Sequence, residues 1–107
     1  MSFELMADRL KALADPTRLR IVAMLKTRDF CICELVPYFN ISQPAVSKHM
    51  QRLRAAKLVT EQRKGQWVFY SLAEELPASI QQLVNELPDL SQEIDALQQK
   101  GLLVCCD

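Results

Sequence analysis

Apolar residues at helical spacing organise the first third of the chain. Those nearest the N-terminus are Phe3, Met6, Leu10 and Leu13. Their steps of three and four residues predict a first helix with one apolar seam. Asp15 can cap the next helix and Pro16 suits its first position, so a second helix should begin there. Apolar residues lie on more than one face of this second helix, which predicts that it is the buried central helix.

Residues 31–54 show two helical segments joined by a tight connection at Asn40 and Ile41. Ser42 can cap the second segment by accepting a backbone N–H bond, and Pro44 falls in its first turn. Its apolar stripe consists of Val46, Met50 and Leu53. The opposite side is polar and basic, and two helices joined so closely form a helix-turn-helix. We interpret the second helix as a DNA-recognition helix, although an ordinary amphipathic helix with a solvated charged face would show the same pattern.

The pattern changes after the recognition helix. Residues 58–62 and 66–72 are rich in β-branched and aromatic side chains, with Lys64 and Gly65 between them, which predicts a β-hairpin wing. From residue 76 a heptad seam predicts a helix that packs along another helix. The seam residues are Leu76, Ile80, Leu83, Leu87, Leu90, Ile94 and Leu97. Pro88 lies inside the seam and should kink or split this helix, because it removes a backbone donor and clashes with the preceding turn.

Length and charge bound the class of protein. The chain has 107 residues, of which 50% are apolar, so we expect one small domain over residues 1–101 and a short cysteine-containing tail over 102–107. Residues 1–66 hold 12 Lys and Arg against 6 Asp and Glu, whereas residues 67–107 hold 1 against 7. A basic half that contains the recognition helix favours nucleic-acid contact, although solvated charge alone could produce the same asymmetry.

Targeting signals and catalytic motifs are weak in this sequence. There is no apolar run long enough to span a membrane and no signal-peptide pattern, so we expect a cytoplasmic protein without membrane contact. No nucleophilic triad or paired-carboxylate arrangement is visible, and two glycines are too few for a phosphate-binding loop. We therefore expect no enzymatic activity. A module that binds only other proteins is the weaker alternative to a DNA-binding protein.

Four cysteines form two close pairs, Cys31 with Cys33 and Cys105 with Cys106. In a cytosolic chain this clustering favours a metal or redox site over a structural disulfide. Cys31 and Cys33 lie at the start of the first helix of the helix-turn-helix, where unpaired N–H groups favour the thiolate. Residues two apart on a helix point roughly 200° apart. We therefore expect that both thiols can bind one ion only if the helix start unwinds, which would disturb the recognition helix.

Three motifs occur in order along the chain: residues 14–21, with Asp15, Pro16, Thr17 and Arg18; residues 31–35, with both cysteines; and residues 42–49, from Ser42 to His49. Together they resemble the ArsR/SmtB family of winged-helix repressors, most of all its arsenic-responsive branch. The resemblance implies a mainly α fold with a β-hairpin wing, and terminal helices that form a homodimer interface. It also implies repression of an operator with an imperfect inverted repeat when no metal is bound, and release when metal binds.

The resemblance and the polarity of the helix together give candidate DNA contacts. Short polar side chains near the start of a recognition helix can meet base edges, and basic side chains can meet phosphates. The expected base contacts are Gln43 and Ser47, with His49 less certain because it borders the apolar stripe. The expected phosphate contacts are Lys48, Arg52, Arg63 and Lys64. No cofactor should be needed for DNA binding.

The candidate effector site departs from the family in one respect. Arsenic-sensing relatives have a third cysteine shortly after the first two, and here that position is Val36. A three-thiolate As(III) or Sb(III) centre would therefore need Cys105 or Cys106, in the same subunit or across the dimer. Cd(II) and Pb(II) would also suit three or four thiolates, whereas zinc would lack the His ligands that zinc-sensing relatives use. A thiol redox or persulfide sensor uses the same residues, and Cys31 and Cys33 would also fit as small buried side chains without a sensing role.

Overall fold

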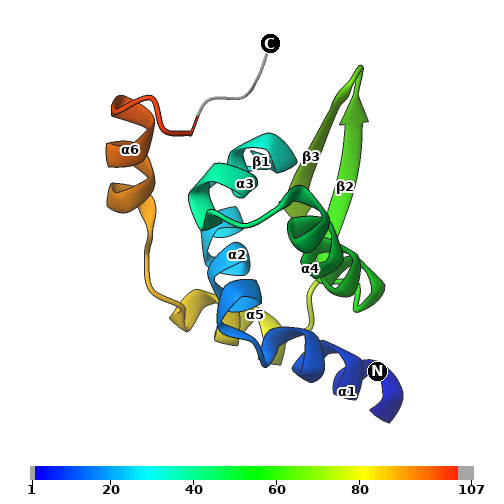
Figure 1. Ribbon diagram of the computed structural model, residues 1–107. Coiled ribbons are helices and arrows are strands. Elements are labelled where there is room, and N and C mark those ends of the chain that lie inside the picture. The colour runs from blue at the N-terminus through cyan, green and yellow to red at the C-terminus, as the bar shows by residue number, and fades with distance from the viewer. Residues whose placement is uncertain (1, 104–107) are drawn as a thin grey trace.

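The computed structural model describes residues 2–103, which form six helices and a three-stranded sheet (Figure 1). In chain order the elements are α1 (Phe3–Leu13), α2 (Pro16–Thr27), β1 (Phe30–Cys31), α3 (Ile32–Phe39), α4 (Gln43–Ala55), β2 (Val59–Lys64), β3 (Trp67–Leu72), α5 (Ala78–Glu86) and α6 (Ser91–Gln99). Helices α3 and α4 form the helix-turn-helix, and β2 and β3 form the wing. The expected mainly α fold with a β-hairpin wing is confirmed.

Side-chain caps define where the functional helices begin. The carboxylate of Asp15 accepts the backbone N–H of Arg18 at 3.0 Å, and the hydroxyl of Ser42 accepts that of Ala45 at 3.3 Å. Both caps satisfy N–H groups that lack a partner inside the helix. Asn40 ends α3 in the left-handed conformation with φ 54°, which allows the short connection to α4. The predicted starts of α2 and α4 are confirmed.

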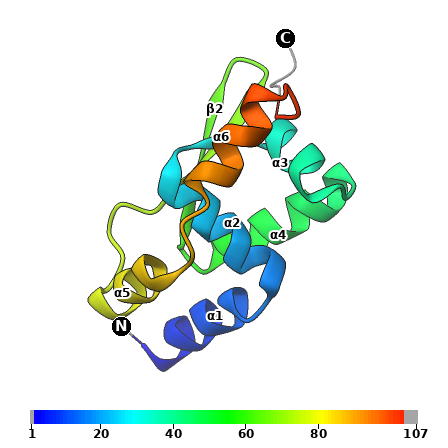
Figure 2. The same ribbon diagram turned by 90° about the vertical axis from the view of Figure 1, so that its left-hand side faces the viewer.

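Helix α2 is the centre of the fold. Its residues Ile21, Val22, Ala23, Met24 and Leu25 are all buried, so it presents apolar side chains in every direction. It packs against α1, α4, β3, α5 and α6, and Figures 1 and 2 show it passing through the middle of the molecule. The prediction of a buried central helix is therefore correct.

The sheet has the strand order β1-β3-β2 and is antiparallel throughout. In the wing Lys64 pairs with Trp67, and Gly65 in the turn between them has φ +63°, a conformation that favours glycine. Strand β1 was not expected from the sequence. Cys31, which we expected inside the first helix of the helix-turn-helix, lies in β1 and pairs with Phe69. A strand of two residues is too short to show any periodicity, and this explains the error.

The C-terminal seam is split in two, as Pro88 predicts. Helix α5 ends at Glu86 and α6 begins at Ser91, whose backbone N–H is accepted by Asp89 at 2.9 Å. Both halves pack against the core of their own chain, with Ile80 and Ile94 buried. The seam residues thus lie against α2 and its neighbours rather than along one continuous helix.

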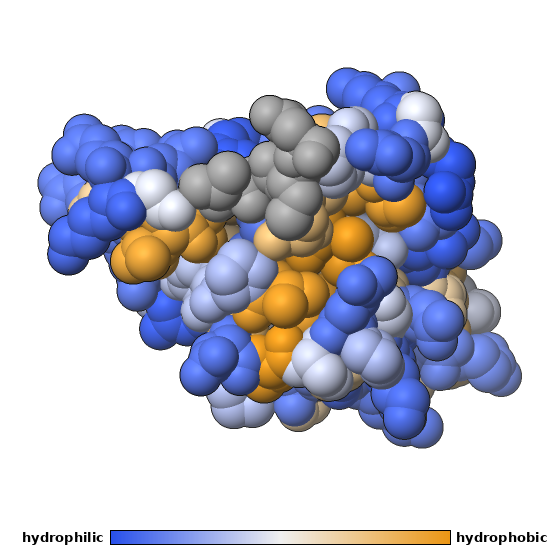
Figure 3. Space-filling model, turned by 45° about the horizontal axis from the view of Figure 1, so that its top comes forward, coloured by the Kyte–Doolittle hydropathy of each residue, from blue (hydrophilic) through white to orange (hydrophobic). Residues whose placement is uncertain are grey.

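Part of the apolar surface remains uncovered, as expected for so short a chain. The face seen in Figure 3 has apolar side chains gathered across its middle, between hydrophilic margins. Among the described residues the large apolar side chains that are most exposed are those of Phe3, Leu10 and Leu102. Within residues 2–103 no helix combines the length and apolarity needed to cross a membrane.

The cap at Asp15 gives a test of this fold. Its pKa is lowered, chiefly by the hydrogen bond from the backbone N–H of Arg18. Asp15→Ala should lower the free energy of unfolding at pH 7 by about 1 kcal/mol, measured by urea denaturation. Because the folded-state pKa lies below the ordinary value of 3.8, the cap contributes above that value and its contribution disappears as the pH falls through the lowered pKa. The matched variant Asp8→Ala, on the exposed side of α1, should change stability little; an equal loss in both would contradict the assignment.

Candidate DNA interface and thiol site

Helix α4 separates its polar and apolar sides as its sequence predicts. Val46, Met50 and Leu53 are buried against the rest of the domain. Of the candidate contacts on this helix, Gln43, Lys48 and Arg52 are exposed, and Ser47 and His49 are half-buried. Gln43 and Ser47 lie four residues apart and so share one face of the first turns. The structure therefore leaves these two polar side chains near the start of α4 accessible to a ligand.

His49 lies on a different side of α4 and contacts another element. Its Nδ1 is 3.2 Å from Nη1 of Arg18 in α2, and Nε of the same guanidinium donates to the carbonyl of Ala12 at 2.6 Å. Arg18 thus joins the end of α1, the start of α2 and the middle of α4. Sequence reasoning missed this role of Arg18. No local spacing could reveal it, because Arg18 and His49 are 31 residues apart.

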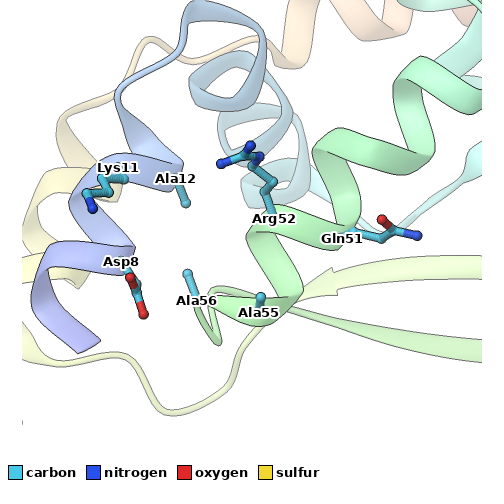
Figure 4. Close-up of a pocket in the computed structure, with 7 residues that line it drawn as sticks. All are labelled: Asp8, Lys11, Ala12, Gln51, Arg52, Ala55 and Ala56. Carbon is cyan, nitrogen blue, oxygen red and sulfur yellow. The ribbon is translucent and has the colours of Figure 1, made fainter. Parts of the chain in front are cut away.

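Arg52 borders a shallow hollow between α1 and α4. The hollow has a volume of ≈ 330 Å³, and Figure 4 shows the Arg52 side chain directed toward α1 while Gln51 points away from it. The lining residues are Asp8, Lys11, Ala12, Gln51, Arg52, Ala55 and Ala56. Lys11 is a second cation at this hollow, and the sequence analysis did not include it among the candidate contacts.

The remaining candidate contacts lie near the tip of the wing. Arg63 and Lys64 are both exposed, and Lys64 Nζ lies 5.2 Å from the centre of the Phe69 ring. Adjacent residues of a strand point to opposite faces, so Arg63 and Lys64 flank the hairpin rather than share one side. A nucleic-acid backbone that passes one face of the wing would meet one of them more closely than the other.

The thiols of Cys31 and Cys33 lie together at the start of α3. Their Sγ atoms are 2.7 Å apart, and the Cys31 sulfur also accepts the backbone N–H of Cys33 at 3.4 Å. Our expectation that the two thiols diverge by the helical angle is wrong. Cys31 is the N-cap of α3 and has extended backbone dihedrals, so helical periodicity does not apply to it. Both sulfurs can therefore meet one ion without unwinding of the helix.

A buried carboxylate fixes this arrangement. Oε1 of Glu34 accepts the backbone N–H of Cys31 at 3.0 Å and completes a capping box around the start of α3. Oε2 of Glu34 accepts from Arg28 at 2.9 Å, and the Glu34 residue is only 5% exposed. Cys31 itself is 1% exposed, whereas Cys33 is half-buried. The pair is thus a dithiol in which Cys31 is buried and Cys33 lies nearer the surface.

The other two candidate ligands, Cys105 and Cys106, lie outside the described residues. Within residues 2–103 no group of three or more His, Cys, Asp or Glu side chains is placed to hold a metal ion. The chain just before the tail packs against the domain, because Leu103 is buried in the core. Figure 2 shows this end of the described chain, drawn in red, near the start of α3.

Comparison with known proteins identifies relatives of this arrangement. Residues 15–61 match the family described as "Bacterial regulatory protein, arsR family". The chain is 38% identical over 84 residues to the "Arsenic resistance transcriptional regulator ArsR1" of Pseudomonas putida, covering 78% of this chain and 66% of that protein. It is 37% identical over 94 residues to the "Arsenical resistance operon repressor" of Escherichia coli K12, covering 87% of this chain and 80% of that protein.

A solved structure shows the same fold at similar identity. HlyU from Vibrio cholerae is 30% identical and superposes with a TM-score of 0.68, covering 79% of this chain and 91% of that one. The matched family region, residues 15–61, includes the cap of α2, the thiol pair, α3 and α4. The family match therefore includes the thiols and the candidate DNA contacts on α4, whereas Arg63 and Lys64 of the wing lie just beyond it.

Proposed function

Because the chain belongs to the ArsR family of bacterial regulatory proteins, which are DNA-binding transcriptional regulators, we propose that it is a homodimeric repressor that As(III) or Sb(III) releases from its operator. The observation that carries the effector assignment is the close pair of thiols at the start of the helix-turn-helix, with sulfurs 2.7 Å apart. Soft, thiophilic ions prefer such ligands.

The third ligand is assigned to the tail. In the reaction, As(OH)3 and three thiols give one arsenic–trithiolate centre and three waters, so each As–O bond is replaced by an As–S bond without a redox change. Cys31 and Cys33 provide two sulfurs. Either Cys105 or Cys106 would provide the third, in the same subunit or across the dimer.

Ligation can disturb the DNA-binding elements through sulfur geometry. Metal–thiolate bonds are about 2.3 Å long, so two sulfurs on one ion at angles near tetrahedral lie about 3.8 Å apart. The contact between the Cys31 and Cys33 sulfurs places both within reach of one ion, which would fix their separation and the geometry of the cap. Cys31 is both the cap of α3 and a residue of β1, so a change in this geometry would act on the helix that precedes α4 and on the sheet that carries the wing.

On DNA, the two α4 helices of a dimer would enter successive major grooves of an imperfect inverted repeat. Two-fold symmetry then sets the half-site centres about 34 Å apart or a multiple of that distance. Gln43 and Ser47 would contact bases, with His49 close by and held by Arg18. Lys48, Arg52, Arg63 and Lys64 would contact phosphates.

Two substitutions separate the base and phosphate roles. Gln43→Ala should relax sequence preference, by about 1–3 kcal/mol of discrimination at one base pair if the contact is bidentate. Lys64→Ala should weaken binding to all duplexes and reduce the slope of log affinity against log salt by about one. Affinities are measured by fluorescence anisotropy over a salt series. Lys100→Ala, which removes the same charge at the end of α6, serves as the control, and the opposite pattern for Gln43 and Lys64 would refute the assignment.

Native mass spectrometry of the reduced protein tests the effector. With arsenite we expect one arsenic per subunit and the loss of three protons. Cys31→Ser, or Cys105→Ser combined with Cys106→Ser, should abolish the adduct or reduce the loss to two protons. In the tail double variant, Val36→Cys should restore the loss of three protons, because position 36 lies one turn after Cys33 on the same helix face. Full binding without the tail cysteines would contradict the proposed third ligand.

The same measurement separates the alternative functions. Adducts with Cd(II) or Pb(II) and none with arsenite would indicate a repressor for those ions on the same scaffold. Failure of every metal, together with a disulfide or persulfide under mild treatment, would indicate a thiol redox sensor. The short distance between the Cys31 and Cys33 sulfurs is compatible with each of these chemistries, so the experiment and not the geometry decides among them.

The dimer should form through α1, because the seam of α5 and α6 packs within its own chain. Phe3 is 93% exposed and Leu10 is 51% exposed, and they lie two turns apart on one side of α1. Phe3→Glu combined with Leu10→Glu should convert the dimer to a monomer in sedimentation velocity at micromolar concentration. Leu102→Glu, an equally apolar exposed position outside α1, should leave the dimer intact. A wild-type protein that remains monomeric would show that the homodimer is wrong.

A further inference from the structure

A row of three directly paired residues crosses the sheet. Tyr70 in β3 lies opposite Phe30 of β1 on one side and opposite Glu61 of β2 on the other. Directly paired residues of antiparallel strands share one face and contact each other. This row therefore joins the edge strand that contains Cys31 to the outer strand of the wing.

At the wing end of the row, one carboxylate joins three elements. Oε1 of Glu61 accepts the phenolic hydroxyl of Tyr70 at 3.0 Å, and Oε2 lies 3.0 Å from Nη1 of Arg54 in α4. Tyr70 is 5% exposed, and its burial, reinforced by the hydrogen bond to Glu61, raises its pKa to about 12. The phenol is thus a neutral donor at every physiological pH. Glu61 thereby connects both wing strands to the last turns of the recognition helix.

At the thiol end, the row continues into the capping network. The Arg28 guanidinium lies 3.9 Å above the centre of the Phe30 ring, and the same group pairs with Glu34 at 2.9 Å. Glu34 in turn accepts the backbone N–H of Cys31 at 3.0 Å. A series of side-chain contacts and one strand pairing, that of Phe30 with Tyr70, therefore runs from the backbone of Cys31 to Arg54.

We propose that Glu61 and Tyr70 are positioning residues for DNA binding, which fix the wing against the recognition helix and link that junction to the thiol pair. Neither residue needs to touch DNA. The inference rests on the proposed function for its DNA measurements, but the mechanical link between the wing and α4 is a property of the free protein.

The outer strand of the wing is exposed over most of its length. In β2 only Val59 is buried, and the five residues that follow it are exposed and pair with β3. Beyond Val59, the ion pair of Glu61 with Arg54 joins this exposed part of β2 to α4. We therefore expect the contacts of Glu61 to help set the angle between the hairpin that carries Arg63 and Lys64 and the helix that carries Gln43.

The test compares two variants whose electrostatic effects on DNA differ. Tyr70→Phe leaves the charge unchanged, whereas Glu61→Gln removes a negative charge and would by electrostatics alone tighten binding. We expect both variants to bind a duplex selected by the wild-type protein from a randomised library about fivefold more weakly, the factor that loss of one hydrogen bond of typical strength gives. For Tyr70→Phe the salt slope should stay unchanged, because no phosphate contact is lost.

Tyr38→Phe is the matched control, because Tyr38 also donates its hydroxyl to a carboxylate, that of Glu93 at 3.0 Å, but lies outside the sheet. It should bind the duplex like the wild type. If wild-type affinity falls by some factor on adding arsenite, that factor should shrink in Tyr70→Phe and persist in Tyr38→Phe. Wild-type affinity in Tyr70→Phe, or tighter binding by Glu61→Gln, would overturn the proposal.

Hydrogen exchange of the free protein separates this inference from the proposed function. Amides of β2 and β3 should exchange faster in Tyr70→Phe than in the wild type, while those of α2 keep their protection. Unchanged protection in the wing would overturn the link even if the wild type binds DNA and arsenite. Faster exchange in a protein whose wild type binds no duplex would instead support the link and count against the proposed repressor.

Discussion

The buried carboxylate of Glu34 is the group on which the thiol end of the molecule depends. A buried charge is tolerated only when it is paired and hydrogen-bonded, and Glu34 meets both conditions through Arg28 at 2.9 Å and the backbone N–H of Cys31 at 3.0 Å. These contacts hold Cys31 in an extended conformation at the boundary between β1 and α3. The closeness of the two sulfurs follows from that backbone conformation, so the dithiol is a product of helix capping as much as of the cysteines themselves.

One residue of the proposed effector site, Cys31, has several structural roles. Cys31 serves at once as a strand residue, a helix cap and a proposed ligand, so a change in its geometry on binding an ion would act on a strand pairing and on a cap. Loss of a cap costs about 1 kcal/mol, which lies within the range of about 1 to 3 kcal/mol that allosteric coupling usually has. In the proposed switch, a change confined to this cap would therefore be sufficient in energy to alter DNA affinity.

Local sequence signals predicted most of the fold and part of the site. The caps at Asp15 and Ser42, the apolar stripe of α4 and the hairpin around Gly65 all act over a few residues, and each is present as predicted. The contact of Arg18 with His49 depends on tertiary packing over 31 residues and has no local signal. The prediction of the thiol geometry was wrong for a different reason. It applied the helical angle to Cys31, which the two-residue strand β1 places just outside the helix.

The heptad seam shows that a pattern can predict packing without predicting the partner. Pro88 divides the seam, and each half then finds its apolar partner in its own chain, which leaves α1 with the most exposed large side chain, that of Phe3. In the link between the two halves, the ammonium of Lys26 donates to the carbonyl of Leu87 at 2.8 Å. Helix α6 carries an exposed ion pair between Glu93 and Arg20. Exposed pairs contribute little stability. Because α6 precedes the cysteine-containing tail, its packing through the buried Ile94 holds in place the described residues that lead into the tail.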